Sequence, residues 1–555
     1  MDSSYWSRWH QRRLSRRAWL RTSLIGISGA AVLGTIGCGD DDDDDDEASS
    51  SPTAATANPT SVPVKRGGRA TLGQATDFIG LRGLDPHTST TQSGLWRSIF
   101  DVLLAVTPDG NIDADSSLAK THEIPNDTRF VFHLREGVKF HDGTELDAEA
   151  IKFNFMRAKD TSIKGGGIYA VTYAVIDSIE ATDKYTVAFN LTRPDAALIA
   201  NLSERGGMIT SPTHSKATQL EDLRTQPVGT GPYKLASWKS DQTTSLVPFE
   251  DHWRKRADGG RYALLDEMLI KVIPDPIVQV ASLQGGEIDV LSSAPASQLD
   301  LLFNDKNLNP NVFKGGLHLS WWINMLLAPA DNADFRRSLM WAWDKEATNK
   351  VFYQGRAEIA DSILTSASWA HKSVAGYPGF DMTKAKDFMA KSGIPESERV
   401  MEVVPTSADT TTILQAMAKQ WEQLGVTIKF APSSEFQARA FKNAGAKGDV
   451  QMFSSGGHRG EPDTYLRQAL TEKGSWNIGA APLPTVEPLV NKAVTTYKLE
   501  ERKAIYSEIQ DLQAQDLLSW ATGLFVPTFG FSGKGVTGLS NDFNGYEFWK
   551  DLGRI

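Results

Sequence analysis

A histidine and an aspartate stand side by side at His141 and Asp142, within the stretch EGVKFHDGTEL of residues 136–146. Their side chains could form a catalytic dyad or part of a metal site. Asp142 is also followed by Gly143, and an Asp-Gly pair is typical of a tight turn. The elements on either side must decide between a dyad and the corner of a hairpin.

The residues before this pair alternate between apolar and polar side chains, which predicts strands. The residues after it predict a helix capped by Asp147, since aspartate accepts hydrogen bonds from the first free amides of a helix. The positions expected to be buried are Phe130, Phe132, Leu134, Val138 and Phe140 on the strands, and Ile151, Phe155 and Ala158 on the helix.

Sequence motifs of the commonest enzyme classes are missing. The chain has no Gly-x-Ser-x-Gly elbow and no His-Glu-x-x-His pair, and its glycine-rich segment at 65–70 lacks the spacing of a phosphate-binding loop. The formal net charge is −10, which argues against a nucleic-acid partner. The absence of these motifs agrees with a binding protein.

The first 38 residues have the pattern of an export signal. Arg16 and Arg17 precede an apolar run at 22–37, which is shorter than the ~20 residues of a membrane-spanning helix. This arrangement resembles a twin-arginine signal. Cys38, the only cysteine, excludes an intrachain disulfide. Its position resembles a lipobox, which predicts a lipid anchor, while the alternative is an incidental cysteine near a cleavage site.

Residues 39–64 are acidic and rich in Ser, Thr, Ala and Pro, with almost no large apolar side chains. Such a segment cannot bury enough apolar surface to order itself, so we expect a disordered tether. Beyond it, strand-like and helix-like segments alternate. The pattern predicts helices that stop at Gly285, Gly393 and Gly425, and an α/β protein with mixed sheets.

An ordered series of motifs resembles the extracytoplasmic solute-binding proteins, family 5, of peptide, nickel and opine ABC importers. These motifs are GLDPHTST at 83–90, LREGVKFHDG at 134–143, PVGTGPYKLASW at 227–238, LQGGEIDV at 283–290, the stretch at 323–346, and the last helix and strand at 501–530. In that family the His-Asp-Gly element is a turn, so the resemblance implies a structural role for His141 and Asp142.

The resemblance implies a two-lobed fold of the periplasmic-binding-protein type (class II, cluster C) with mixed sheets and an extra inserted subdomain. Lobe I would comprise residues 65–110, 205–270 and 525–555, the inserted subdomain residues 111–204, and lobe III residues 271–524. The protein would be a monomer without a cofactor or a metal, would close its lobes over a solute, and would deliver it to permease and ATPase subunits. It would work in the periplasm or at the cell surface.

The solute itself is left open. In peptide-binding relatives an aspartate a few residues before an acidic residue and a proline binds the peptide's ammonium group. Counting back from Glu461-Pro462 places that position at His458, followed by Arg459. These side chains suit an anionic or hydroxyl-rich group better than an ammonium group. A shifted alignment, with Arg459 in solvent, is the alternative, and peptides, sugars and metal chelates all remain candidates.

Further candidate solute contacts follow from position in the resemblance. They are Trp96, Trp322, Asn324, Trp369, His371 and Trp476. Tryptophan faces suit rings, cations and apolar groups alike. The main alternative function is a sensor or chaperone-like module that uses the same cleft but feeds no transporter.

Overall fold

The computed structural model describes residues 64–555 except 78, 80–82, 89–93, 108–111, 164–168, 171, 441–448, 458–459, 475, 479–480, 517–519 and 542–546. Val64–Ile555 forms one unit, separate from Met1–Pro63. The predicted signal, Cys38 and all of the tether except Val64 lie outside the described residues.

A four-stranded antiparallel sheet carries the hairpin predicted around Phe130. Its order is β4 (Ala119–Asn126), β5 (Arg129–Leu134), β7 (Thr186–Leu191), β6 (Ile176–Asp183). Helix α5 (Ala148–Lys159) packs on this sheet through Phe155, whose ring centroid lies 5.0 Å from that of Phe189. The predicted cap is confirmed, because the Ala150 amide donates to Asp147 at 2.8 Å. The eight positions expected to be buried are all buried.

An eleven-stranded mixed sheet forms the rest of the framework. Its order is β15-β14-β16-β12-β17-β11-β1-β10-β9-β8, with β13 at the side of β17. The bounds are β1 Arg69–Gln74, β8 Tyr233–Lys239, β9 Thr243–Pro248, β10 Glu267–Val272, β11 Val290–Leu291, β12 Leu308–Trp322, β13 Glu358–Ile359, β14 Val400–Pro405, β15 Thr427–Phe430, β16 Gln451–Gly457 and β17 Trp520–Gly533. Parallel pairs join β1 to β10 and β11, and β14 to β15 and β16.

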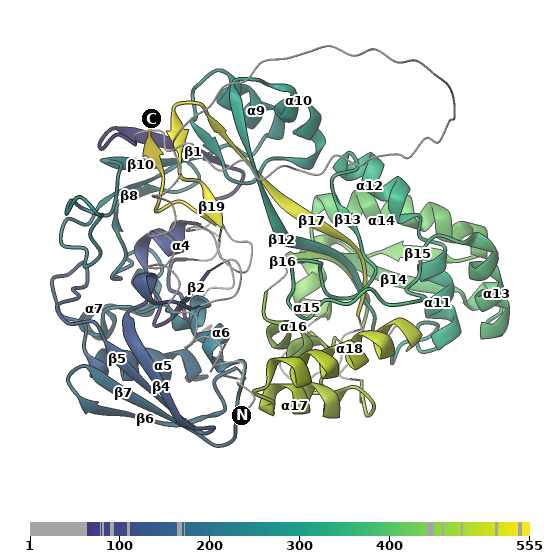
Figure 1. Cartoon of the computed structure of the whole chain (residues 1–555). Coiled ribbons are helices and arrows are strands. Elements are labelled where there is room, and N and C mark those ends of the chain that lie inside the picture. The colour runs from purple at the N-terminus through teal and green to yellow at the C-terminus, as the bar shows by residue number, and fades with distance from the viewer. Residues whose placement is uncertain are drawn as a thin grey trace, which may run out of the picture. The chain divides into compact units, whose positions relative to one another are not determined.

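Strands β12 and β17 connect the two ends of this sheet (Figure 1). The second half of β12 pairs with β16, whereas the second half of β17 pairs with β11. The register between β12 and β17 shifts between Phe313 and Leu317. Among the described strands this long antiparallel pair is the only bridge between the β14–β16 end and the β1–β11 end. A two-stranded bridge can twist more easily than a wide sheet.

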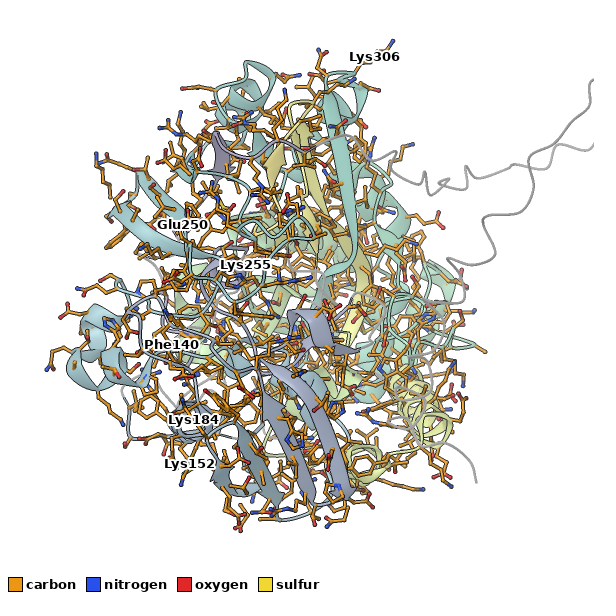
Figure 2. The ribbon with its side chains drawn as sticks, turned by 60° about the vertical axis from the view of Figure 1, so that its left-hand side comes forward. Phe140, Lys152, Lys184, Glu250, Lys255 and Lys306 are labelled. Atoms are coloured by element: carbon orange, nitrogen blue, oxygen red, sulfur yellow. The ribbon has the colours of Figure 1, made fainter. Side chains whose placement is uncertain are left out.

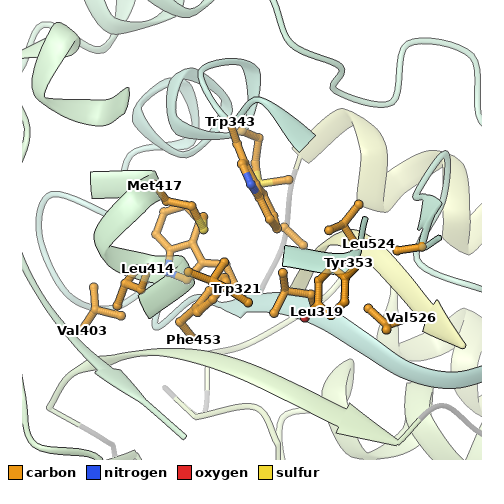
Figure 3. Close-up of a cluster of buried hydrophobic side chains, with 14 of the residues drawn as sticks. Leu319, Trp321, Trp343, Tyr353, Val403, Leu414, Met417, Phe453, Leu524 and Val526 are labelled. Atoms are coloured by element: carbon orange, nitrogen blue, oxygen red, sulfur yellow. The ribbon is translucent and has the colours of Figure 1, made fainter. Parts of the chain in front are cut away.

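Successive side chains of β12 point to opposite faces, and each face has its own core. Trp321 enters a core with Trp343 and Phe453 (Figure 3). Trp421 belongs to the same core. The indole of Trp321 lies 5.4 Å from that of Trp421. Helices α11 (Ala333–Trp341), α12 (Lys345–Tyr353), α13 (Met382–Ser392) and α14 (Ala408–Trp421) contribute to this core, as do α9 and α10, whose bounds are given below. The predicted stop at Gly393 is confirmed, since this glycine caps α13 at φ 67°.

Trp322 enters the core on the opposite face. Helices α16 (Pro462–Ala469), α17 (Glu487–Thr495) and α18 (Leu499–Asp516) contribute to this core. The remaining elements are α4 Gly94–Ile99, β2 Ala105–Val106, β3 Ile112–Asp113, α6 Leu198–Leu202, α7 Pro212–Ala217, α8 Leu220–Leu223, α9 Pro276–Gln284, α10 Leu299–Asn304, α15 Phe436–Ala440, β18 Val536–Thr537, β19 Ser540–Asn541, β20 Glu547–Phe548 and β21 Gly553–Arg554.

The first and last described segments meet beside β1. The Lys65 amide donates to the Arg554 carbonyl oxygen at 2.7 Å. The Arg554 guanidinium binds both carboxylate oxygens of Asp289, at 2.8 and 2.9 Å, and the Arg69 carbonyl oxygen. In Figure 2 the labelled Lys306 lies far from Lys152 and Lys184, which belong to the part with the four-stranded sheet.

Candidate functional site

The His141-Asp142 pair forms the corner of a hairpin. The Gly143 amide donates to the Phe140 carbonyl at 2.9 Å, and Gly143 has a φ of 85° that favours glycine. Asp142 accepts hydrogen bonds from the Thr144 amide at 3.0 Å and from the Ser211 hydroxyl at 2.5 Å. The predicted turn is confirmed.

The His141 imidazole fastens this corner to the loop of residues 229–231. Its Nε2 lies 2.9 Å from the Gly231 carbonyl oxygen, and its Nδ1 accepts from the Gly229 amide at 3.4 Å. These two contacts fit a neutral ring that is protonated on Nε2. Burial lowers the pKa of His141 to about 4. Both ring nitrogens are therefore occupied by backbone groups.

Two predicted solute residues, Trp322 and Trp476, meet in an aromatic group with Trp520 and Tyr465. The Trp322 ring stacks on Trp520 at 5.2 Å with an interplanar angle of 2°. Trp476 meets Trp322 edge-on at 5.6 Å and Tyr465 at 4.9 Å. Trp322 is buried, but Trp476 is partly exposed. Trp476 is the member of this group that a solute could touch without rearrangement.

Trp369 and His371 lie close in sequence but have different partners. Trp369 is partly buried, and the Arg502 guanidinium carbon lies 5.3 Å from its ring centroid. His371 directs Nε2 to Asp361 at 2.9 Å. Arg502 also pairs with Glu461, as described below. Of these two residues, Trp369 is therefore the one linked to the segment around Glu461.

The other two predicted residues have structural contacts. Asn324 is fully buried, and its side-chain oxygen accepts from the Leu326 amide at 3.1 Å. Trp96 is fully buried in α4, within the core that also contains Trp549. Contact of either residue with solute stays a prediction.

His458 and Arg459 lie outside the described residues, but the segment that follows them is described. Glu461 accepts from the Asp463 amide at 3.1 Å and so caps α16. Its carboxylate pairs with Arg502 of α18 at 2.5 Å, and both side chains are almost fully buried. Burial raises the pKa of Glu461, against the opposing effect of Arg502. The Glu461–Arg502 pair holds the start of α16 against α18.

A second buried ionic group lies farther along α16, and it escaped the sequence analysis. Arg467 binds Asp463, on the same helix, at 2.6 Å and Asp195, from the segment before α6, at 3.2 Å. The exposed fractions of the three side chains are 11% for Arg467, 2% for Asp463 and 0% for Asp195. We call Asp195, Asp463 and Arg467 the crossing cluster, because it joins the segment before α6 to helix α16. Asp195 and Arg467 are 272 positions apart in the sequence.

Within the described residues, no group of three His, Cys, Asp or Glu side chains is arranged to hold a metal ion. The same part of the chain contains no helix that is both long and apolar enough to span a membrane. The side chains described above therefore provide partly exposed aromatic rings and buried ion pairs.

Known proteins resemble most of the chain. Residues 115–477, more than half of it, match the family described as bacterial extracellular solute-binding proteins, family 5 middle. The chain is 28% identical over 435 residues to heme-binding protein A of Haemophilus influenzae, covering 72% of this chain and 77% of that protein. It is 26% identical over 436 residues to the dipeptide-binding protein of Escherichia coli, covering 72% and 79%.

Solved structures show the same fold. The periplasmic binding protein DppA of Helicobacter pylori, in complex with the peptide STSA, superimposes with a TM-score of 0.77 at 20% identity, covering 88% of this chain and 98% of that one. NikA of Staphylococcus aureus, in complex with nickel and L-histidine, gives a TM-score of 0.73 at 19% identity, covering 88% and 100%. The predicted α/β, two-lobed fold class is confirmed.

Proposed function

This chain belongs to the family 5 bacterial extracellular solute-binding proteins, and on that basis we propose that it binds a small solute between its lobes. As a member of that family it is the substrate-binding component of an ABC importer, acts outside the cytoplasm and is not an enzyme. The family match over residues 115–477 carries this conclusion.

For the solute, we propose a molecule with an anionic group and an apolar or planar body. Counting back from Glu461-Pro462 without gaps puts His458 at the position of the ammonium-binding aspartate of peptide-binding relatives, and Arg459 follows it. The partly exposed Trp476 and Trp369 offer rings for stacking. Relatives bind solutes as different as heme, dipeptides and glutathione, so family membership does not select among them.

Thermal unfolding in the presence of hemin, glutathione, Met-Leu, N-acetyl-Met-Leu and nickel with L-histidine tests this proposal. A solute at a hundredfold excess over its Kd stabilises the folded protein by about 2.7 kcal/mol. We expect stabilisation by anionic solutes that lack a free amine, and we expect Arg459→Ala to weaken it. Arg439→Ala, which alters an arginine bound to Glu402 and Asp449, is the control. Stabilisation by free-amine peptides alone would contradict the proposal.

We further propose that solute capture closes the lobes about the β12–β17 bridge. The three-part division of residues 65–555 predicted above is retained in this proposal. Two facts support it: strands β4–β7 pair only with one another among the described strands, and β12 and β17 alone join the two ends of the large sheet. A ligand that contacts both lobes favours their closed arrangement.

Finally, we propose that Arg16 and Arg17 direct export and that acylated Cys38 anchors the mature protein to the membrane. The two arginines precede an apolar run and Cys38 follows it, which supports this proposal. Fractionation of cells tests both parts. Arg16→Lys with Arg17→Lys should block export, and Cys38→Ser should move the exported protein from the membrane to the soluble fraction. Export of the double variant, or a membrane-bound Cys38→Ser protein, would contradict the respective part.

A further inference from the structure

Helix α16 has one face in a core and another against the four-stranded part of the chain. Its core face carries Tyr465 and Leu466, and the Tyr465 ring packs on Trp476 and Trp520. The other face carries the Asp463 and Arg467 of the crossing cluster and Thr464. The same helix therefore touches the aromatic group and the segment that follows β7.

Several contacts cross between these two parts next to the crossing cluster. Arg467 reaches Asp195, and the Thr464 hydroxyl donates to Asn201 at 3.2 Å. The Ala196 amide donates to the Val494 carbonyl at 2.7 Å. Tyr497 accepts from the Asp195 amide at 3.1 Å and donates to the Asp127 carbonyl at 2.9 Å. Arg467–Asp195 is the charged contact in this set.

The crossing cluster can be divided without leaving an unpaired cation. Asp463 and Arg467 are four residues apart on α16, so they stay paired if the two parts separate. Asp195 would then lose its ion-pair partner Arg467, and water would solvate its carboxylate. While the parts are together, Asp195 is fully buried and depends on Arg467 for a counter-charge. These are the properties of a contact that can open and close.

We propose that Arg467 is a positioning residue that holds the lobes in the closed arrangement by pairing with Asp195. It does not touch the solute. Its guanidinium keeps Asp463 in both arrangements and gains Asp195 only on closure. This role rests on the lobe closure proposed above, and it adds the residue that determines how stable the closed arrangement is before any solute binds.

Distances between two spin labels test this role in the solute-free mature chain. Cys38→Ser removes the native thiol, and Lys120→Cys on β4 and Lys419→Cys on α14 supply exposed labelling sites on the two parts. We expect Arg467→Met to raise the ratio of long-distance to short-distance populations about tenfold. Arg467→Lys should give a smaller rise, because it keeps the charge but loses the planar fork.

Two further variants make the result decisive. Asp195→Asn breaks the crossing ion pair from the other side and leaves Asp463–Arg467 intact, so it should also lengthen the distance. It decides the outcome if Arg467→Met fails to fold. Arg439→Met is the matched control, since Arg439 binds Glu402 and Asp449 within one part, and it should leave the distances unchanged.

Distance distributions of Arg467→Met and Asp195→Asn that superimpose on that of the unsubstituted protein would overturn the role of Arg467. The thermal unfolding experiment with the five solutes tests the solute class separately from the role of Arg467. If these variants open the protein but none of the five solutes stabilises it, the solute class is wrong and Arg467 keeps its role. If a solute shortens the distance equally in all variants, the proposal of solute capture is supported and the positioning role of Arg467 is contradicted.

Discussion

Two buried ionic groups lie along the same short helix, α16, and differ in what they join. Glu461 and Arg502 connect the start of α16 to α18, and both helices belong to one core. The crossing cluster connects α16 to Asp195, in the segment between β7 and α6. In the first group both charges lie within one core. In the second, the lobe opening proposed above would be enough to bring water to Asp195.

The difference shows that burial alone does not say whether a charge pair is permanent. Both groups have side chains with little or no exposure, and burial raises the pKa of both Glu461 and Asp195. What separates them is the location of the partner. A buried pair within one core adds to the cost of unfolding, while a buried pair between two parts adds to the cost of opening.

The largest effect should come from Arg502→Met. This substitution leaves Glu461 buried without its counter-charge and removes the cation above Trp369. Removing one partner of a buried ion pair costs about 3–5 kcal/mol. Urea unfolding at pH 7, followed by circular dichroism, should show this loss in the free energy of unfolding.

Lys498→Met is the control next to the same helix, because Lys498 directly precedes α18 and pairs with Glu501 in an exposed position. Exposed pairs contribute about 0–1 kcal/mol, so this variant should unfold almost as the unsubstituted protein does. A similar loss of unfolding free energy for Lys498→Met and Arg502→Met would contradict the distinction between the buried and the exposed ion pair.

A smaller loss, about 1–2 kcal/mol, is expected for Arg467→Met in the same unfolding measurement. Opening can hydrate Asp195, so the protein avoids the full cost of a buried unpaired charge. A loss as large as that of Arg502→Met would mean that the crossing cluster is part of a permanent core. The two ionic groups would then not differ in the way described above.

The last effect depends on pH and concerns a fixed polar site elsewhere, the hairpin corner at His141. Folding lowers the pKa of His141 from about 6.5 to about 4, so between these values the unfolded chain binds more protons than the folded one. Stability should therefore fall as the pH drops from 6.5 to 4, by at most about 1.4 kcal/mol per pH unit for one histidine.

His141 and His87 should together produce an acid-dependent loss of stability, because burial also lowers the pKa of His87 to about 4. His141→Phe should reduce this joint loss by about half, since His87 keeps its own contribution. Unfolding free energies at pH 7, 6, 5 and 4.5 provide the slopes. An unchanged slope in the variant would show that His141 titrates in the folded protein as it does in the unfolded chain.

Local signals in the sequence predicted the elements well because the structure uses them locally. Asp147 caps α5, and Gly393 and Gly425 adopt the left-handed conformation at the ends where the periodicity stops. The hairpin at Asp142 also depends on residues within a few positions of one another.

The site was harder to predict, because its contacts join residues far apart in the chain. Nothing near Asp195 indicates Arg467, and nothing near Glu461 indicates Arg502. Tryptophan adds a second difficulty, since its ring suits a core and a binding surface equally. Trp96 and Trp322 were both predicted to contact solute, and both are buried in cores, whereas Trp476 and Trp369 are partly exposed.

The meeting of Lys65 with Arg554 has a consequence for the synthesis of this protein. The strand that opens the framework, β1, lies beside the guanidinium of Arg554, a residue that the ribosome adds 485 positions after Arg69. A chain interrupted before Arg554 would lack the Arg554 contacts to Asp289 and Arg69. Completion of this region during synthesis must therefore wait until Arg554 has been added.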